Sequence, residues 1–242
     1  MSKQNKEPIT HTTTPICVGS SVIGMKYKDG IIIASDTRLN YEGMCKMMNV
    51  EDRVQQLTPR TVMGYSGEYS DLQETTRMLK EMILNDTLEG TPTLGPTELA
   101  NYLAAVHYYR RNKMNPFLNS VITGGVDWNG DIVLMNIDPY GTLLQANYFT
   151  TAMSHYFCNA IIAPQYPKDP NEMTKEKALD LLKKCFEVLF YRDISAGNVI
   201  KYSTLEKVNN DLKYEEGKFT VDSKWGYDKF KNQANENRYL TC

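Results

Sequence analysis

The sequence predicts an α+β fold in one large domain, and three observations support this prediction. Alternating apolar and polar residues flank the turn dipeptides Asp29-Gly30 and Asn129-Gly130, which predicts two β-hairpins. Apolar residues at helical spacing form groups both before and after the second hairpin. The chain has 242 residues, of which 41% are hydrophobic, and this is enough for one sizeable core.

The N-terminal part of the domain is expected to consist of strands. The first hairpin joins strands near residues 20–27 and 30–36, with Asp29-Gly30 in a type I′ turn, because both central positions of that turn need a positive φ. Further strands are expected near 53–57 and 61–65.

Two helices are expected next. The first begins at Ser70, where Ser70-Asp71-Leu72-Gln73 has the form of a capping box. The second begins at about Thr97, and its apolar residues repeat at helical spacing: Leu99, Tyr102, Leu103 and Val106. Its C-terminal end carries three cations that suit the helix dipole: Arg110, Arg111 and Lys113.

Strands, two helices and strands are expected in the second half. Strands near 119–126 and 131–137 form the second hairpin. A short helix is expected from Ser154 to Ala163, and a longer one from Thr174 with the apolar stripe Ala178, Leu181, Leu182, Cys185, Val188 and Leu189. The last strands are expected near 198–204 and 211–221.

Composition limits the classes of function. No run of about 18 apolar residues exists, so no membrane span is expected. The polar segment 1–11 lacks the apolar region of a secretory signal, which favours the cytoplasm and nucleus. A net charge of −2 and a pI near 6.0 argue against nucleic acid as the main partner.

No metal or cofactor is expected. The five cysteines are odd in number, widely scattered and without zinc-site spacing, and they are Cys17, Cys45, Cys158, Cys185 and Cys242. The three histidines, His11, His107 and His155, are isolated from one another and from the cysteines, so a role as ligand or base is not favoured.

Three segments in order resemble proteasome β subunits: the hairpin Gly19–Asp36, the turn Gly64–Asp71 with the form GxSGxxxD, and Tyr191–Gly197, which is similar to YRDxxSGG. The resemblance covers roughly residues 12–222 and implies the four-layer αββα sandwich of the N-terminal nucleophile hydrolases. It divides the chain into a leader or propeptide-like segment at 1–11, the β-subunit domain at 12–222, and a C-terminal extension at 223–242.

In this family the nucleophile is a threonine whose own free α-amino group serves as the base, since such an amine titrates near pH 8. Counting back from Asp36 by the family's separation places Ser20 at that position, after Gly19, the residue at which active precursors are cut. Ser20 has a hydroxyl, but it becomes a chain terminus only if the Gly19–Ser20 bond is cleaved.

Two further positions depart from the active pattern. Arg53 takes the place of the family's lysine, and arginine stays protonated with a pKa above about 12, so it is not a tunable charge. An ion pair between Arg53 and Asp36 is the expected role. Ala196 replaces the serine of YRDxxSGG, although Asp193 is retained. The resemblance therefore implies an inactive site without a catalytic residue.

Other motifs indicate the β7 type within the family. The run Thr12-Thr13-Thr14-Pro15 is similar to the start of β7-type subunits. Thr14 lies six residues before Ser20, about 20 Å of extended chain, so it could not reach Asp36 and Arg53 by continuing the strand. Tyr108–Pro116 resembles the basic RR-x-KMNP stretch of that type, and Gly64–Gln73 resembles its GxSGxYxDxQ variant.

The resemblance implies a non-catalytic β7-type subunit of the 20S core. Its partners would be the other α and β subunits of the heptameric rings, in ATP- and ubiquitin-dependent protein degradation. The alternative is a weak N-terminal-nucleophile peptidase that uses Ser20 after cleavage at Gly19.

The C-terminal tail also leaves two interpretations open. Its polar composition fits a frayed, solvated terminus. Its aromatic residues Trp225, Tyr227 and Phe230 instead fit an arm anchored in another subunit. The resemblance favours the arm, because β7-type subunits have extensions that reach the opposite β ring.

Overall fold

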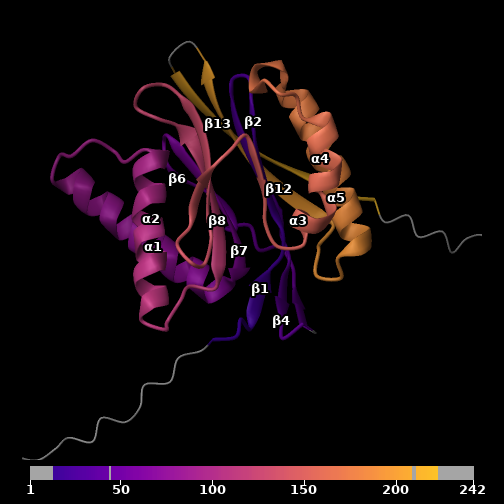
Figure 1. The fold of residues 1–242 in the computed structure, drawn as a ribbon, viewed down its shortest axis with the longest axis horizontal. Helices are drawn as coiled ribbons and strands as arrows, with labels where there is room; N and C mark the ends of the chain where they lie inside the picture. Colours follow the sequence, from indigo (N-terminus) through magenta and orange to yellow (C-terminus); the bar gives the residue numbers. More distant parts are fainter. Residues whose placement is uncertain (1–12, 44, 209–210, 223–242) are drawn as a thin grey trace, which may run out of the picture.

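The computed structural model describes residues 13–43, 45–208 and 211–222. Two antiparallel sheets stack face to face, and helices cover both outer faces, which confirms the four-layer αββα sandwich (Figure 1). Helices α1 (Tyr69–Leu88) and α2 (Pro96–Asn112) lie on one side. Helices α3 (Ser154–Phe157), α4 (Asn159–Gln165) and α5 (Lys175–Arg192) lie on the other, with a short 3-10 turn at Pro170–Glu172 before α5.

Sheet A lies under α1 and α2. Its order is β10 (Leu143–Gln145), β9 (Ile132–Ile137), β8 (Asn119–Val126), β7 (Thr61–Glu68), β1 (Cys17–Gly19), β4 (Leu39–Tyr41) and β5 (Cys45–Met47), and β6 (Val54–Thr58) also pairs with β7. Sheet B has the order β11 (Tyr148–Thr150), β2 (Val22–Tyr27), β3 (Gly30–Asp36), β12 (Val199–Val208) and β13 (Asp211–Thr220).

Strand β3 shows how the layers are built from the sequence. Because successive side chains of a strand point to opposite faces, Ile31 and Ile33 pack between the sheets, while Ile32 and Ala34 pack toward α5. A strand covered on both faces needs a continuous apolar run, and Ile31–Ala34 supplies it.

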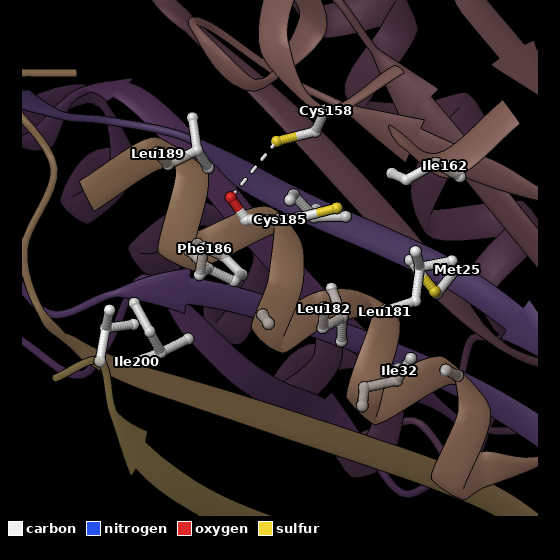
Figure 2. Close-up of a cluster of buried hydrophobic side chains, with 14 of the residues drawn as sticks. Met25, Ile32, Cys158, Ile162, Leu181, Leu182, Cys185, Phe186, Leu189 and Ile200 are labelled. Atoms are coloured by element: carbon white, nitrogen blue, oxygen red, sulfur yellow. Dashed lines mark hydrogen bonds between the residues drawn. The ribbon is translucent and has the colours of Figure 1, made fainter. Parts of the chain in front are cut away.

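The layer between α5 and sheet B is the largest of the three apolar clusters in the described residues. Figure 2 shows Leu181, Leu182, Cys185, Phe186 and Leu189 of α5 facing Met25, Ile32 and Ile200 of sheet B. The Cys158 thiol donates a hydrogen bond to the Cys185 carbonyl at 3.7 Å. The predicted helical stripe is confirmed, except that Phe186 is buried whereas Val188 is only half-buried.

Two predicted turn and cap assignments are wrong. Tyr27 pairs with Gly30, so the hairpin loop is Lys28-Asp29 and Gly30 belongs to β3. A glycine stands there because a Cβ would collide with the Leu205 carbonyl oxygen of β12. The predicted capping box is also wrong, since Ser70 lies inside α1 and Glu68 is the N-cap, accepting from the Ser70 amide.

Several element bounds also differ from the prediction. Ser20 and Ser21 lie outside the strands, and β2 begins at Val22. The helix expected at Ser154–Ala163 is divided into α3 and α4. The three-residue strands of the structure were not predicted: β1, β4, β5, β10 and β11. The predicted leader and C-terminal extension lie outside the described residues.

Candidate functional site

The candidate site lies where the chain passes from sheet A to sheet B. Strand β1 is inserted between β4 and β7, with Gly19 opposite Leu39 on one side and Gly67 on the other. Ser20 and Ser21 then connect β1 to β2. Ser20 is buried, with 4% of its surface exposed, so the position predicted for the nucleophile is an internal, enclosed link between two strands.

Asp36 and Arg53 form the predicted ion pair at the floor of this site. Asp36 ends β3 and Arg53 immediately precedes β6, and both are buried. Arg53 Nη1 donates to Asp36 Oδ1 and, at 3.0 Å, to the Asp36 carbonyl. Asp36 Oδ2 accepts from the Gly197 amide at 2.6 Å. Burial raises the pKa of Asp36, while the Arg53 charge and the Gly197 amide lower it.

The same guanidinium also holds the backbone around Ser20. Arg53 Nη2 donates to the Ser20 carbonyl and, at 3.3 Å, to the Ser21 carbonyl. Its Nε donates to the Tyr65 carbonyl at 3.3 Å, and its atoms lie directly against Gly19, where a side chain would collide with them. Arg53 is therefore fully used as a structural fork, which a lysine with its single ammonium could not reproduce.

The Ser20 hydroxyl forms hydrogen bonds with a carboxylate and with a second hydroxyl. Ser20 Oγ donates to Asp193 Oδ2 at 2.6 Å and lies 3.1 Å from Ser195 Oγ. Ser195 Oγ also contacts Asp193 Oδ1 at 2.5 Å. Asp193, which the chain retains from the YRDxxSGG pattern, thus lies beside Ser20.

Sequence reasoning missed Ser195, which precedes Ala196, the residue aligned with the family's serine. The Ala196 carbonyl accepts from Arg38 Nη1 at 2.7 Å, and the Ala196 amide donates to the Asp193 carbonyl at 3.1 Å. Asn40 Nδ2 donates to the Ser195 carbonyl at 2.9 Å, so the loop is held by its backbone. No signal in the sequence shows which of the neighbouring residues 195 and 196 turns toward Ser20.

Chemically, this arrangement holds the Ser20 hydroxyl beside a carboxylate. The nitrogen of Ser20 could accept a proton only as a free α-amine, after cleavage of the Gly19–Ser20 bond, because a peptide amide is not a base. Within the described residues, the hydrogen-bond partners of Ser20 Oγ are Asp193 and Ser195. The part of the chain that the structure describes contains no group of three or more His, Cys, Asp or Glu side chains that could hold a metal ion.

Comparison with known proteins decides the family. The family model described as proteasome subunit matches residues 17–205 of this chain. The chain belongs to the proteasome subunit family. It is 33% identical to the proteasome subunit beta type-4 of Arabidopsis thaliana, over 94% of this chain and 89% of that protein. It is 30% identical to the proteasome subunit beta type-7 of Saccharomyces cerevisiae, over 92% of this chain and 85% of that protein.

These relatives identify the chain as a β subunit of the 20S core, within the protein-degrading family that the sequence motifs indicated. In this β subunit Thr14 lies in the exposed, irregular segment before β1, while the site at Ser20 is enclosed. Strand β1 separates the two positions along the chain. No helix of the described residues is long and apolar enough to cross a membrane.

Glu68 is a second residue that sequence reasoning missed. Its Oε2 accepts from the Ile16 amide at 2.5 Å and the Cys17 amide at 3.1 Å, while Oε1 accepts from Ser70 Oγ at 3.0 Å. Burial, and then the Glu68 charge, raise the pKa of the Cys17 thiol. One carboxylate therefore fastens the segment before Ser20 to the start of α1 in this β subunit.

Proposed function

We propose that this chain is a non-catalytic, β7-type structural subunit that completes the heteroheptameric β ring of the 20S proteasome in ATP- and ubiquitin-dependent protein degradation. The observation that carries the proposal is the enclosure of the site: β1 pairs on both sides in sheet A, and Ser20 is buried directly after it. As long as the Gly19–Ser20 bond stays intact, the site has no free amine, and the Ser20 hydroxyl then lacks its base.

Arg53 supports the same function. A compact lysine ammonium can change the pKa of a neighbouring amine, and it can lose its own proton when buried. A guanidinium keeps its proton and here holds the carbonyls of Ser20 and Ser21 together with Asp36. Its role is to stabilise the junction between the sheets rather than to assist proton transfer.

The β7 type is supported by the basic run Tyr108–Pro116 and by relatives named beta type-7, although other relatives carry the name beta type-4. We further propose that residues 223–242 reach the opposite β ring and stabilise the joining of half-particles. The proposed location is the cytoplasm and nucleus.

The test is Ser20→Ala in the assembled particle. Peptide hydrolysis of every specificity should remain unchanged, because Ser20 is not expected to react. The N-terminal residue of the subunit purified from its complex should lie at or before Thr14. Selective loss of one cleavage specificity, with assembly intact, would overturn the proposal.

The alternative is a weak peptidase that uses Ser20 after cleavage at Gly19. The hydrogen bond from Ser20 Oγ to Asp193 supports this alternative, because it places a carboxylate beside the hydroxyl. An N-terminus at Ser20 in the mature particle would establish this alternative. A triple variant, Ser20→Thr with Arg53→Lys and Ala196→Ser, should still fail to cleave itself rapidly at Gly19, since β1 stays fastened in the sheet.

The tail is tested separately by deleting the residues after Asp222. The truncated chain should fold and enter half-particles, while the joining of half-particles should slow and the full particle should weaken. Normal joining of truncated half-particles would refute the role of the tail and leave the ring position of the domain unaffected.

A further inference from the structure

The end of α2 carries the basic motif that the inactive site does not use. One of its cations is structural: the Arg110 guanidinium carbon lies 3.9 Å from the Phe117 ring centroid, and Arg110 Nε donates to the Asn115 carbonyl at 3.2 Å. Met114 takes the left-handed conformation, with φ of 55°, as the chain turns back. This turn leaves the neighbouring side chains facing outward.

Six exposed side chains at and beside this end of α2 are here called the α2 surface: Tyr108, Tyr109, Arg111, Lys113, Met114 and Tyr140. The Arg111 guanidinium carbon lies 5.6 Å from the Tyr108 ring centroid and 5.8 Å from that of Tyr140, which comes from the turn between β9 and β10. Lys113 Nζ lies 5.6 Å from the Tyr109 ring centroid. Two elements therefore build the surface together.

The four large apolar side chains of the α2 surface are widely open to solvent. Tyr108 is 54% exposed, Tyr109 63%, Tyr140 65% and Met114 78%. Tyrosine, methionine and arginine are the residue types enriched at protein interfaces, where aromatic and arginine side chains contribute most of the binding free energy. This composition indicates a docking surface rather than an ordinary solvated helix end.

Charge indicates what docks there. No carboxylate of the described residues lies within 4.0 Å of the charged nitrogens of Arg111 or Lys113. By contrast, Arg77 on α1 and Lys175 on α5 each pair with two glutamates. Two rings lie beside the Arg111 guanidinium, whose planar fork can donate to a carboxylate in a bidentate pair.

We propose that the α2 surface docks onto a carboxylate-bearing surface of a neighbouring subunit in the assembled particle. This inference rests on the proposed structural role. Only two free cations lie on the surface, and the whole chain has a pI near 6.0, so a protein surface fits better than the extended phosphate backbone of a nucleic acid.

Carbodiimide cross-linking of intact 20S particles that contain the full chain tests the proposal directly, because this reagent joins an amine to a carboxylate only when they are in contact. Mass spectrometry should find Lys113 linked to an Asp or Glu of another subunit. The proposal is overturned if no such link forms and Lys113 reacts with an amine-modifying reagent as fast in the particle as in the isolated chain.

A charge reversal provides the second test. Arg111→Glu with Lys113→Glu should lower the ratio of particle-bound to free chain by about tenfold, equivalent to losing one strong interfacial charge pair. The matched control exchanges the two cations, Arg111→Lys with Lys113→Arg, and should stay within about twofold of the parent because both charges remain. The melting temperatures of both purified variants should equal that of the parent chain.

The outcomes separate this inference from the proposed function. If the charge-reversed chain enters particles normally and only its retention on heparin falls, the surface binds polyanions and the inference is wrong. If the parent chain is absent from purified particles, the proposed function fails. If the parent chain is present but Lys113 remains freely reactive, only the α2 surface proposal fails.

Discussion

Burying a guanidinium is unfavourable unless its donors are paired, and Arg53 satisfies this condition with five acceptor contacts. Its 1% exposure means that water cannot replace any of them. The pair with Asp36 therefore stabilises the junction of the two sheets only as a complete unit, and the loss of one partner leaves the other buried and unpaired.

Replacing Arg53 by Met is expected to lower the free energy of unfolding by about 3–5 kcal/mol, because Asp36 is left buried without its counter-charge. Asp36→Asn in the same chain should recover part of this loss, since the uncompensated charge is removed. Urea unfolding of the purified chain and its two variants measures both effects. Equal costs for the single and double variants would show that the charge of Asp36 contributes nothing.

His107 is a buried side chain whose charge state should affect stability. Its Nδ1 bonds to the Asp138 carbonyl at 2.9 Å, so it carries the proton, and Nε2 is buried without a partner among the described residues. Burial lowers the pKa of His107, although the Asp138 carbonyl and the Asp71 carboxylate raise it. The neutral ring is therefore the form that the fold accepts.

The pH dependence of stability follows from this lowered pKa. Below about pH 6.5 the unfolded chain takes up a proton on His107 that the folded chain does not. The free energy of unfolding therefore decreases as the pH is lowered, by up to about 1.4 kcal/mol per pH unit. His107→Gln should flatten the curve of unfolding free energy against pH between 7.5 and 5.5. His155→Gln is the matched control substitution, because it replaces an exposed histidine by the same residue.

At the scale of elements, the long periodic segments could be predicted and the short ones could not. The stripe of α5 and its N-cap Thr174 follow from 3.6-residue spacing and local capping. Strand β1 has three residues, too few to show any period, and it exists because β4 and β7 pair with it on both sides. That pairing is a long-range effect, as are the contacts of Ser195 and Glu68 with the site.

Glu68→Ala is expected to loosen the start of strand β1. The substitution removes the acceptor for the Ile16 and Cys17 amides and the N-cap of α1, which should cost about 1–3 kcal/mol together. Hydrogen exchange should become faster at the amides of Ile16 and Cys17 while those of α5 stay protected. Glu89→Ala, at the exposed far end of α1, is the control. Unchanged exchange at Ile16 would show that strand pairing alone holds the segment.

At the scale of the whole molecule, the four layers depend on how closely the two sheets approach. Their inner faces interlock through aliphatic side chains from both sheets, including Val22 and Ile33 of sheet B and Ile122 of sheet A. Gly64, in β7 of sheet A, lies opposite Val22 and Ile33. The same approach brings the end of β3 and the start of β6 together, which is where Asp36 meets Arg53. The ion pair at the candidate site is thus a consequence of the sandwich packing as well as of its own residues.

Gly64→Ala tests this dependence. The added methyl group would lie 2.6 Å from Ile33 Cγ2 and 2.7 Å from Val22 Cγ1, so the sheets must separate slightly, at a cost of about 1–3 kcal/mol in unfolding free energy. Val22→Ala removes the Cγ1 atom and by itself leaves a cavity. In the double variant each change relieves the other, so its measured cost should be smaller than the sum of the two single costs. Strictly additive costs would mean that the sheets do not meet at Gly64, and the contact that sets the layer spacing would have to lie elsewhere.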